Sequence, residues 1–165
     1  MNAALYIGLI PKQDSEKASE SKGPDMNKKK ASITIKTIYP YDEVSDFFTE
    51  ADCTIEPDGT LCMEYEESLV NLNDTRTVMR IKDDSVSIER TRQRGEGCSF
   101  MFFQQNKTHH GKYVTELGEM DICIYTSRLK TKRAQNEVEA DIDYSLMFSK
   151  LDAGVMKLKI NARYS

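Results

Sequence analysis

The charged residues with the clearest potential for chemistry are Glu67 and Arg90, because the pattern around each predicts a side chain that enters the protein interior. Every second residue from Leu61 to Tyr65 belongs to one apolar face, and the same parity reaches Glu67. Arg90 follows Ile88 by two residues and shares its face in the same way. Buried charges cost several kcal/mol each unless they are paired and hydrogen-bonded. We therefore expect Glu67 and Arg90 to be partners near the end of a barrel.

Three further side chains, which the alternation of their strands also points inward, complete the candidate ligand-binding site: Tyr113, Thr115 and Tyr144. Together with the charged pair they could form the polar floor of a small-ligand cavity, because β-barrels usually bind their ligands inside. Two other interpretations stay open. The pair could be a structural ion pair that plugs the barrel end, or two side chains at strand ends that reach solvent.

Other chemistry has little support in the sequence. No serine, cysteine or threonine lies in a recognisable nucleophile motif, and no catalytic residue is predicted. The only histidines, His109 and His110, are adjacent, and adjacent residues of a strand point to opposite faces. They cannot chelate one metal ion together, so we interpret them as a loop or strand-edge pair without a ligand. The sequence predicts no metal and no cofactor.

The elements that must position these residues are β-strands. The clearest is the strict alternation over 136–148, in which Val138, Ile142 and Leu146 lie on one face and acidic residues on the other. Turn-forming residues separate the predicted strands, which are 32–38, 47–55, 61–65, 75–82, 86–92, 98–104, 111–117, 119–129, 136–148 and 155–164. Such a series of short, closely connected strands predicts an all-β protein, an antiparallel up-and-down barrel of about 8–10 strands.

One hairpin, 51–65, can be set in register from its sequence. Its tip, Glu56 to Gly59, has the proline, aspartate and glycine of a type I turn followed by a left-handed residue. The resulting register pairs Cys53 with Met63 on the core face and leaves Cys62 on the other face. A disulfide across the hairpin would need a slip in register. We expect all the cysteines to be free thiols in a reducing cytoplasm.

Length and charge set the remaining limits. The 165 residues suit one domain, and the net charge of -4 gives no general attraction to nucleic acid or to an anionic membrane. No apolar run is long enough for a transmembrane helix, and the apolar stretch 3–10 lacks the flanks of a signal peptide. We expect residues 1–30 to be a disordered tail, with Met26 an alternative natural start, and residues 31–165 to be the barrel.

A basic stretch lies near the C-terminal third of the chain and comprises Arg128, Lys130, Lys132 and Arg133. It is predicted to be a loop between two long strands. Contact with nucleic acid or another anionic partner is one interpretation. A solvated hairpin tip is favoured, because no aromatic residues alternate with the basic ones as stacking platforms would require.

Short motifs in a fixed order also resemble those of a known family. They are Tyr65-Glu-Glu67, Thr75-Arg-Thr77, Met79-Arg-Ile81, Glu89-Arg-Thr91, Met101-Phe-Phe103, Tyr113-Val-Thr115, Asp121-Ile122 and Tyr125-Thr126. Their order and spacing resemble the YwiB-like family of bacterial proteins of unknown function, over about residues 31–164. The resemblance implies a calycin-like β-barrel, related in shape to lipocalins. It implies no activity, and it transfers no functional residues to this chain.

Two functions from different classes follow. The first is a non-enzymatic barrel that binds a small apolar or amphipathic ligand inside. The second is a barrel filled by its own side chains that acts through a protein partner or as a homodimer. A solvent-open cavity lined by Glu67, Arg90 and Tyr113 would favour the first, whereas a closed interior with an exposed apolar face would favour the second.

Overall fold

Antiparallel strands make up nearly all of the computed structural model, which describes residues 28–67, 74–93, 98–115 and 118–165. The ten strands are β1 (Lys29–Ile38), β2 (Val44–Ile55), β3 (Leu61–Glu66), β4 (Thr75–Ile81), β5 (Ser85–Arg92), β6 (Cys98–Gln104), β7 (Lys107–Thr115), β8 (Gly118–Ala134), β9 (Glu137–Phe148) and β10 (Leu151–Tyr164). A short 3-10 helix, η1 (Pro40–Asp42), joins β1 to β2. The described residues contain no α-helix.

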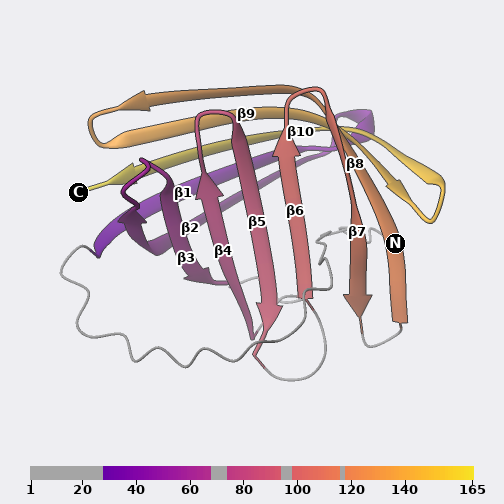
Figure 1. Ribbon diagram of the computed structural model, residues 1–165, viewed down its shortest axis with the longest axis horizontal. Coiled ribbons are helices and arrows are strands. Elements are labelled where there is room, and N and C mark those ends of the chain that lie inside the picture. Colours follow the sequence, from indigo (N-terminus) through magenta and orange to yellow (C-terminus); the bar gives the residue numbers. More distant parts are fainter. Residues whose placement is uncertain (1–27, 68–73, 94–97, 116–117) are drawn as a thin grey trace.

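The strands close into a barrel in which each strand pairs with its neighbours in the sequence, and β10 returns to pair with β1. In Figure 1, β1, β2, β9 and β10 run across the view, whereas β3 to β7 cross them steeply. The barrel is therefore flattened into two crossing layers with the core between them. The predicted all-β, antiparallel up-and-down barrel is confirmed, with a strand number at the upper end of the expected range.

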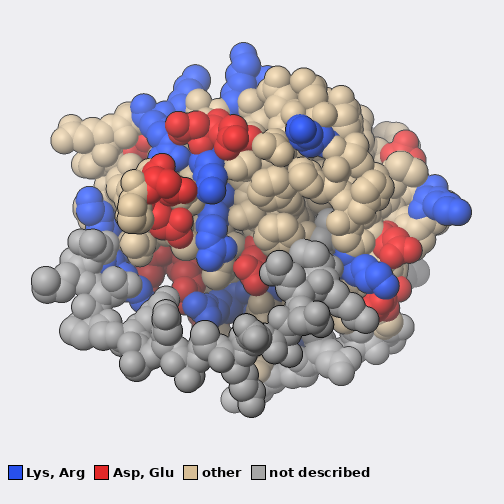
Figure 2. Space-filling model, viewed as in Figure 1, with Lys and Arg blue, Asp and Glu red and all other residues tan. Residues whose placement is uncertain are grey.

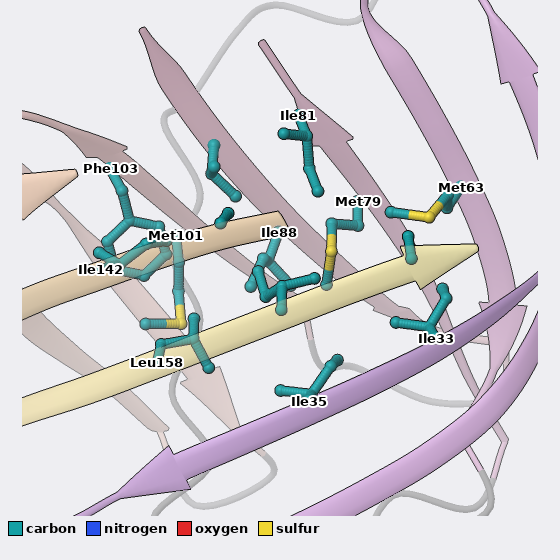
Figure 3. Close-up of a cluster of buried hydrophobic side chains, with 14 of the residues drawn as sticks. Ile33, Ile35, Met63, Met79, Ile81, Ile88, Met101, Phe103, Ile142 and Leu158 are labelled. Carbon is teal, nitrogen blue, oxygen red and sulfur yellow. The ribbon is translucent and has the colours of Figure 1, made fainter. Parts of the chain in front are cut away.

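The interior is filled by the apolar face of every long strand. Along β9, buried side chains alternate with more exposed ones from Val138 to Phe148, as the alternation in the sequence predicts. Side chains from β1, β3, β4, β5, β6, β9 and β10 converge in the core (Figure 3). Because full burial of an Ile, Leu or Phe side chain stabilises a protein by about 1.5–3 kcal/mol, this core is the main source of stability.

The predicted hairpin has the predicted register. Cys53 pairs with Met63, and the turn is closed by a 2.9 Å hydrogen bond from the amide of Gly59 to the carbonyl of Glu56. Gly59 has φ +85, the left-handed conformation that glycine adopts without strain. Cys53 is buried, Cys62 is half-buried on the other face, and all four cysteines of the chain are free.

Several strand boundaries differ from the predicted ones. β1 begins at Lys29 and β2 at Val44, each earlier than expected, and residues 1–27 of the predicted tail lie outside the described part. The loop predicted after residue 129 is wrong, because β8 continues to Ala134. Lys130 pairs with Asp141 across the two strands. Opposite charges that face each other across strands stabilise pairing, so a charged stretch here extends the ladder.

Arg133, the last residue of the basic stretch, holds neighbouring turns by hydrogen bonds. Its guanidinium donates to the carboxylate of Asp83 at 2.7 Å and to the carbonyl oxygens of Gly59 and Ile81, both at 3.0 Å. The hydroxyl of Thr131 donates to the carbonyl of Asp83 at 2.9 Å. The end of β8 is thereby fastened to the turns that precede β3 and follow β4. Arg133 is thus not the solvated tip residue that the sequence favoured.

Gly154 provides a test of the packing between β10 and η1. It has φ +92 and follows an irregularity in the β9–β10 register, and an added Cβ would lie 2.6 Å from Cγ of Pro40. We expect Gly154→Ala to lower the free energy of unfolding by roughly 2–5 kcal/mol, as backbone strain of about 1–2 and overpacking of about 1–3 add. Gly59→Ala is the matched control, because Gly59 has φ +85 and nothing lies within 4 Å of an added Cβ. Equal losses in urea unfolding would show that Pro40 does not constrain this position.

Candidate functional site

Glu67 and Arg90 meet at one end of the barrel, as their parities predict. Glu67 directly follows β3, and its amide donates to the carbonyl of Thr75 at 2.8 Å. Nε of Arg90 lies 3.2 Å from Oε1 of Glu67, and the hydroxyl of Thr77 donates to the same oxygen at 2.8 Å. The Glu67 side chain is only 2 % exposed and that of Arg90 14 %. The pair is therefore largely removed from water, and a third partner hydrogen-bonds it.

The register of β3 to β6 explains why these groups meet. Tyr65 pairs with Thr77, Thr77 with Arg90, and Arg90 with Ser99, so four inward residues form one row across β3, β4, β5 and β6. Residues directly opposite each other in antiparallel strands have Cβ atoms about 4.5–5.5 Å apart. Thr77 therefore lies between the tyrosine and the arginine. The sequence carries a sign of it, since a threonine stands on the apolar face of 75–81.

A cavity of about 60 Å³ opens beside this row. Its lining side chains come from both layers of the barrel and are Ile35, Thr37, Tyr39, Ser45, Phe47, Tyr65, Glu67, Ile88, Arg90, Met101, Tyr144, Met156 and Leu158. A single water needs roughly 10–15 Å³ by this measure, and pockets for drug-sized ligands have about 300–1,000 Å³. The cavity can therefore hold a few waters or a small chemical group in its present shape.

The structure brings together only part of the predicted ligand site. Tyr144 of β9 lines the cavity with Glu67 and Arg90. Tyr113 lies in β7, partly buried against the core, and does not line it. Thr115 pairs with Gly118 at the end of β7, and its side chain lies outside the described residues. Inward parity alone does not determine where in the barrel a side chain lies, so it does not separate Tyr113 from the residues that line the cavity.

The two cavity tyrosines are electrically neutral hydrogen-bonding groups. Burial raises the pKa of Tyr65 and of Tyr144 well above that of an exposed phenol. The hydroxyl of Tyr65 is buried and makes no hydrogen bond of normal geometry with a described residue, although the Thr77 hydroxyl lies near enough to oppose the rise in its pKa. The hydroxyl of Thr75 is also buried without a hydrogen bond. Buried polar groups without a partner are uncommon in native structures. Each such group is either hydrogen-bonded to a water or a ligand, or it destabilises the folded protein.

The histidines point to opposite faces, as predicted. His109 pairs with the buried Ile124, whereas His110 pairs with Cys123 on the outer face. The ring of His109 packs edge-on against Phe102, with centroids 4.6 Å apart. Burial lowers the pKa of His109, and nearby Lys107 acts in the same direction. In the described ranges, no group of three or more His, Cys, Asp and Glu side chains is arranged to hold a metal.

The outer surface carries charges of both signs. On β3 to β5, ion pairs join Glu64 to Arg76 at 2.6 Å and Arg80 to Glu89 at 3.8 Å. Figure 2 shows this mixed area on one side and, over β6 and β7, a broad area with few charged side chains. No helix in the described part of the chain has the length and apolar character to cross a membrane.

Comparison with known proteins gives a family but no activity. The crystal structure of ywiB protein from Bacillus subtilis is similar over 84 % of this chain and 93 % of that chain, with a TM-score of 0.69 and 15 % sequence identity. At this identity the likeness concerns the fold. None of the curated proteins matches the chain. The family described as Domain of unknown function (DUF1934) matches residues 31–160. Since that match covers most of the barrel and agrees with the resemblance in the sequence, the chain belongs to this family of unknown function.

Proposed function

We propose that the barrel binds a small amphipathic molecule at the Glu67–Arg90 end. The observation that carries this proposal is the buried hydroxyl of Tyr65, which belongs to a cavity-lining side chain and has only a weak contact with Thr77, without a hydrogen bond of normal geometry to a described residue. A structural ion pair accounts for the burial of Glu67 and Arg90, since each is the charged partner of the other. It leaves the Tyr65 hydroxyl unexplained, whereas a ligand acceptor atom in the cavity would satisfy it.

The lining indicates the chemistry of the ligand. The polar groups of Tyr65, Glu67 and Arg90 lie on the side of β3 and β5. Apolar side chains such as Met156 and Leu158 come from β10 on the opposite side. A molecule with a polar head and an apolar body matches this division. The cavity of about 60 Å³ admits the head alone. A longer body requires the flexible methionine side chains to change rotamer, which thioether chains do at low cost.

A second function is favoured by a different observation. The interior is nearly full, while large apolar side chains are exposed outside, among them Phe48 at 65 % and Leu151 at 74 %. These properties suit a filled barrel that acts as a protein-interaction module or a homodimer. Under either function, the four free thiols fit the reducing cytoplasm that we propose as the location.

Native mass spectrometry of protein purified from the cells that naturally produce it separates the two functions. We expect a reproducible small adduct on the wild-type monomer. Ser45→Leu should remove it, because Ser45 lines the cavity and a leucine there fills the space. Thr49→Leu is the matched control, since Thr49 lies on the same face of β2 but does not line the cavity. A dimer without an adduct would replace ligand binding by the interaction function.

Tyr65→Phe should separate stability from binding. In the free protein the change removes a buried hydroxyl that has at most a weak contact with Thr77, so we expect the free energy of unfolding to change by no more than about 1 kcal/mol. The adduct should be lost or weakened, because its hydrogen-bond donor is gone. Tyr113→Phe, outside the cavity lining, should change neither quantity. A destabilised Tyr65→Phe protein with an unchanged adduct would contradict the proposed role of the hydroxyl.

A further inference from the structure

Three side chains with soft metal-binding atoms lie in one row on the outer face of the barrel. His110 of β7 is directly opposite Cys123 of β8, and Cys123 is directly opposite Met147 of β9. The row therefore presents an imidazole, a thiol and a thioether on three consecutive strands. It lies on the outside of the wall and has no residue in common with the Glu67–Arg90 cavity.

The outward direction of this row follows from burial. The residues on either side of Cys123 are Ile122 and Ile124, which are 2 % and 0 % exposed and fill the core. Cys123 must then point outward, where it is partly accessible, and Met147 beside it is 39 % exposed. All three side chains line one groove of about 650 Å³, so they share an accessible space.

The spacing of the row suits coordination of a single ion. Side chains directly opposite each other in an antiparallel pair have Cβ atoms about 4.5–5.5 Å apart. Metal–nitrogen and metal–sulfur bonds of about 2.0–2.3 Å bring two donors on one ion within about 4 Å of each other. His110 and Met147 lie on either side of Cys123, two strand spacings or about 10 Å apart. An ion bound by all three must therefore lie over Cys123, with the imidazole and the thioether both rotated toward it.

The donor set selects the metal. Thiolate and thioether ligands are soft and favour Cu(I), whereas magnesium and calcium require oxygen ligands, and zinc sites use thiolate, imidazole and carboxylate rather than thioether. We propose that His110, Cys123 and Met147 form a three-coordinate Cu(I) site on the outer face of the barrel. Asp121 also lines the groove and supplies a negative charge near the site, while Lys150, on the same groove, opposes it.

No other cysteine is both accessible and flanked by two ligating side chains, which makes the row specific. Cys62 is paired with Thr54 on one side and with the cationic Arg80 on the other. Cys53 is buried in the core, and burial raises its pKa, so it is both inaccessible and slow to form a thiolate. The remaining thiol, Cys98, has Thr91 and Val114 as its cross-strand partners. Of the four cysteines, Cys123 is the one flanked by two ligating side chains.

Anaerobic titration of the reduced full-length protein with Cu(I), in competition with a chromogenic Cu(I) chelator, tests the site. We expect one tightly bound ion per chain. Cys123→Ser should weaken binding by more than the roughly 10–100-fold that loss of an outer-shell partner costs at metal sites. Met147→Leu and His110→Gln should each lower the Cu(I) affinity by about tenfold or more. Cys62→Ser, a half-buried thiol on the same outer surface, is the matched control and should bind as the wild type does.

X-ray absorption of the loaded protein gives a second measurement that does not depend on the variants. Two sulfur donors and one nitrogen donor around copper are expected, and Met147→Leu should reduce the sulfur number to one. Unchanged Cu(I) affinity in Cys123→Ser, equal loss in Cys62→Ser, or preferential binding of Zn(II) over Cu(I) would each overturn the proposal. Because the Glu67–Arg90 cavity is not involved, these outcomes are independent of the small-molecule adduct.

Discussion

Arg90→Met is expected to lower the free energy of unfolding by about 3–5 kcal/mol, because removal of one member of a buried ion pair leaves the other charge without compensation. Glu67 would keep the hydrogen bond from Thr77 but lose the guanidinium 3.2 Å away, with its own side chain only 2 % exposed. Urea unfolding followed by circular dichroism measures the loss, provided that the dependence on urea concentration stays constant.

The double variant Arg90→Met/Glu67→Gln identifies the cause. Neutralising the glutamate removes the unpaired charge, so most of the lost stability should return, and the two substitutions should be strongly non-additive. Arg80→Met is the matched control, since Arg80 lies on the outer face of β4 in exposed ion pairs that contribute about 0–1 kcal/mol. If Arg90→Met cost no more than this control, the pair would be solvated, and the barrel end would be open to bulk water.

Another effect on stability concerns the end of β8. Arg133→Ala should lower the free energy of unfolding by about 2 kcal/mol, because two carbonyl oxygens lose a charged donor and a net hydrogen bond contributes about 1 kcal/mol. The contact with Asp83 adds little, since that carboxylate is 85 % exposed. Amide hydrogen exchange should accelerate mainly near Gly59 and Ile81, whose carbonyls Arg133 holds.

Arg133→Lys and Lys132→Ala are the matched variants. Lysine keeps the positive charge but cannot present several N–H groups in a fixed fork, so it should recover less than half of the stability lost in Arg133→Ala. Lys132 is exposed on the same strand, and its removal should change stability by no more than about 0.5 kcal/mol. Full recovery by lysine would mean that charge alone, and not the hydrogen-bond geometry, fastens β8.

The candidate site was predictable in part. Inward parity alone placed Glu67, Arg90 and Tyr144 in the interior, and each does line the cavity. Thr77 was missed because its contribution depends on lying opposite Arg90, a property of the strand register. Tyr113 has the same inward parity and does not line the cavity, although the neighbouring strand β6 contributes Met101 to the lining. Parity identifies a face, and the register identifies the neighbours.

The prediction of a loop at the basic stretch is wrong for a related reason. As a local sequence, charged residues between two strands suggest a turn. In the barrel, Lys130 and Lys132 face Asp141 and Glu139, so the strand pairing gains opposite charges and continues to Ala134. The acidic face of the 136–148 strand was visible in the sequence, yet its partner across the sheet was not assigned.

The sequence by itself determined the all-β class, the faces of the strands and the register of the hairpin around Gly59, because these depend on period-two alternation and on turn chemistry within a few residues. Only the tertiary structure decided how residues from distant strands meet. The row from Tyr65 to Ser99, the small volume of the cavity and the alignment of His110, Cys123 and Met147 are examples. Each depends on closure of the barrel, in which the packing of both layers sets how much space remains and which strand lies beside which.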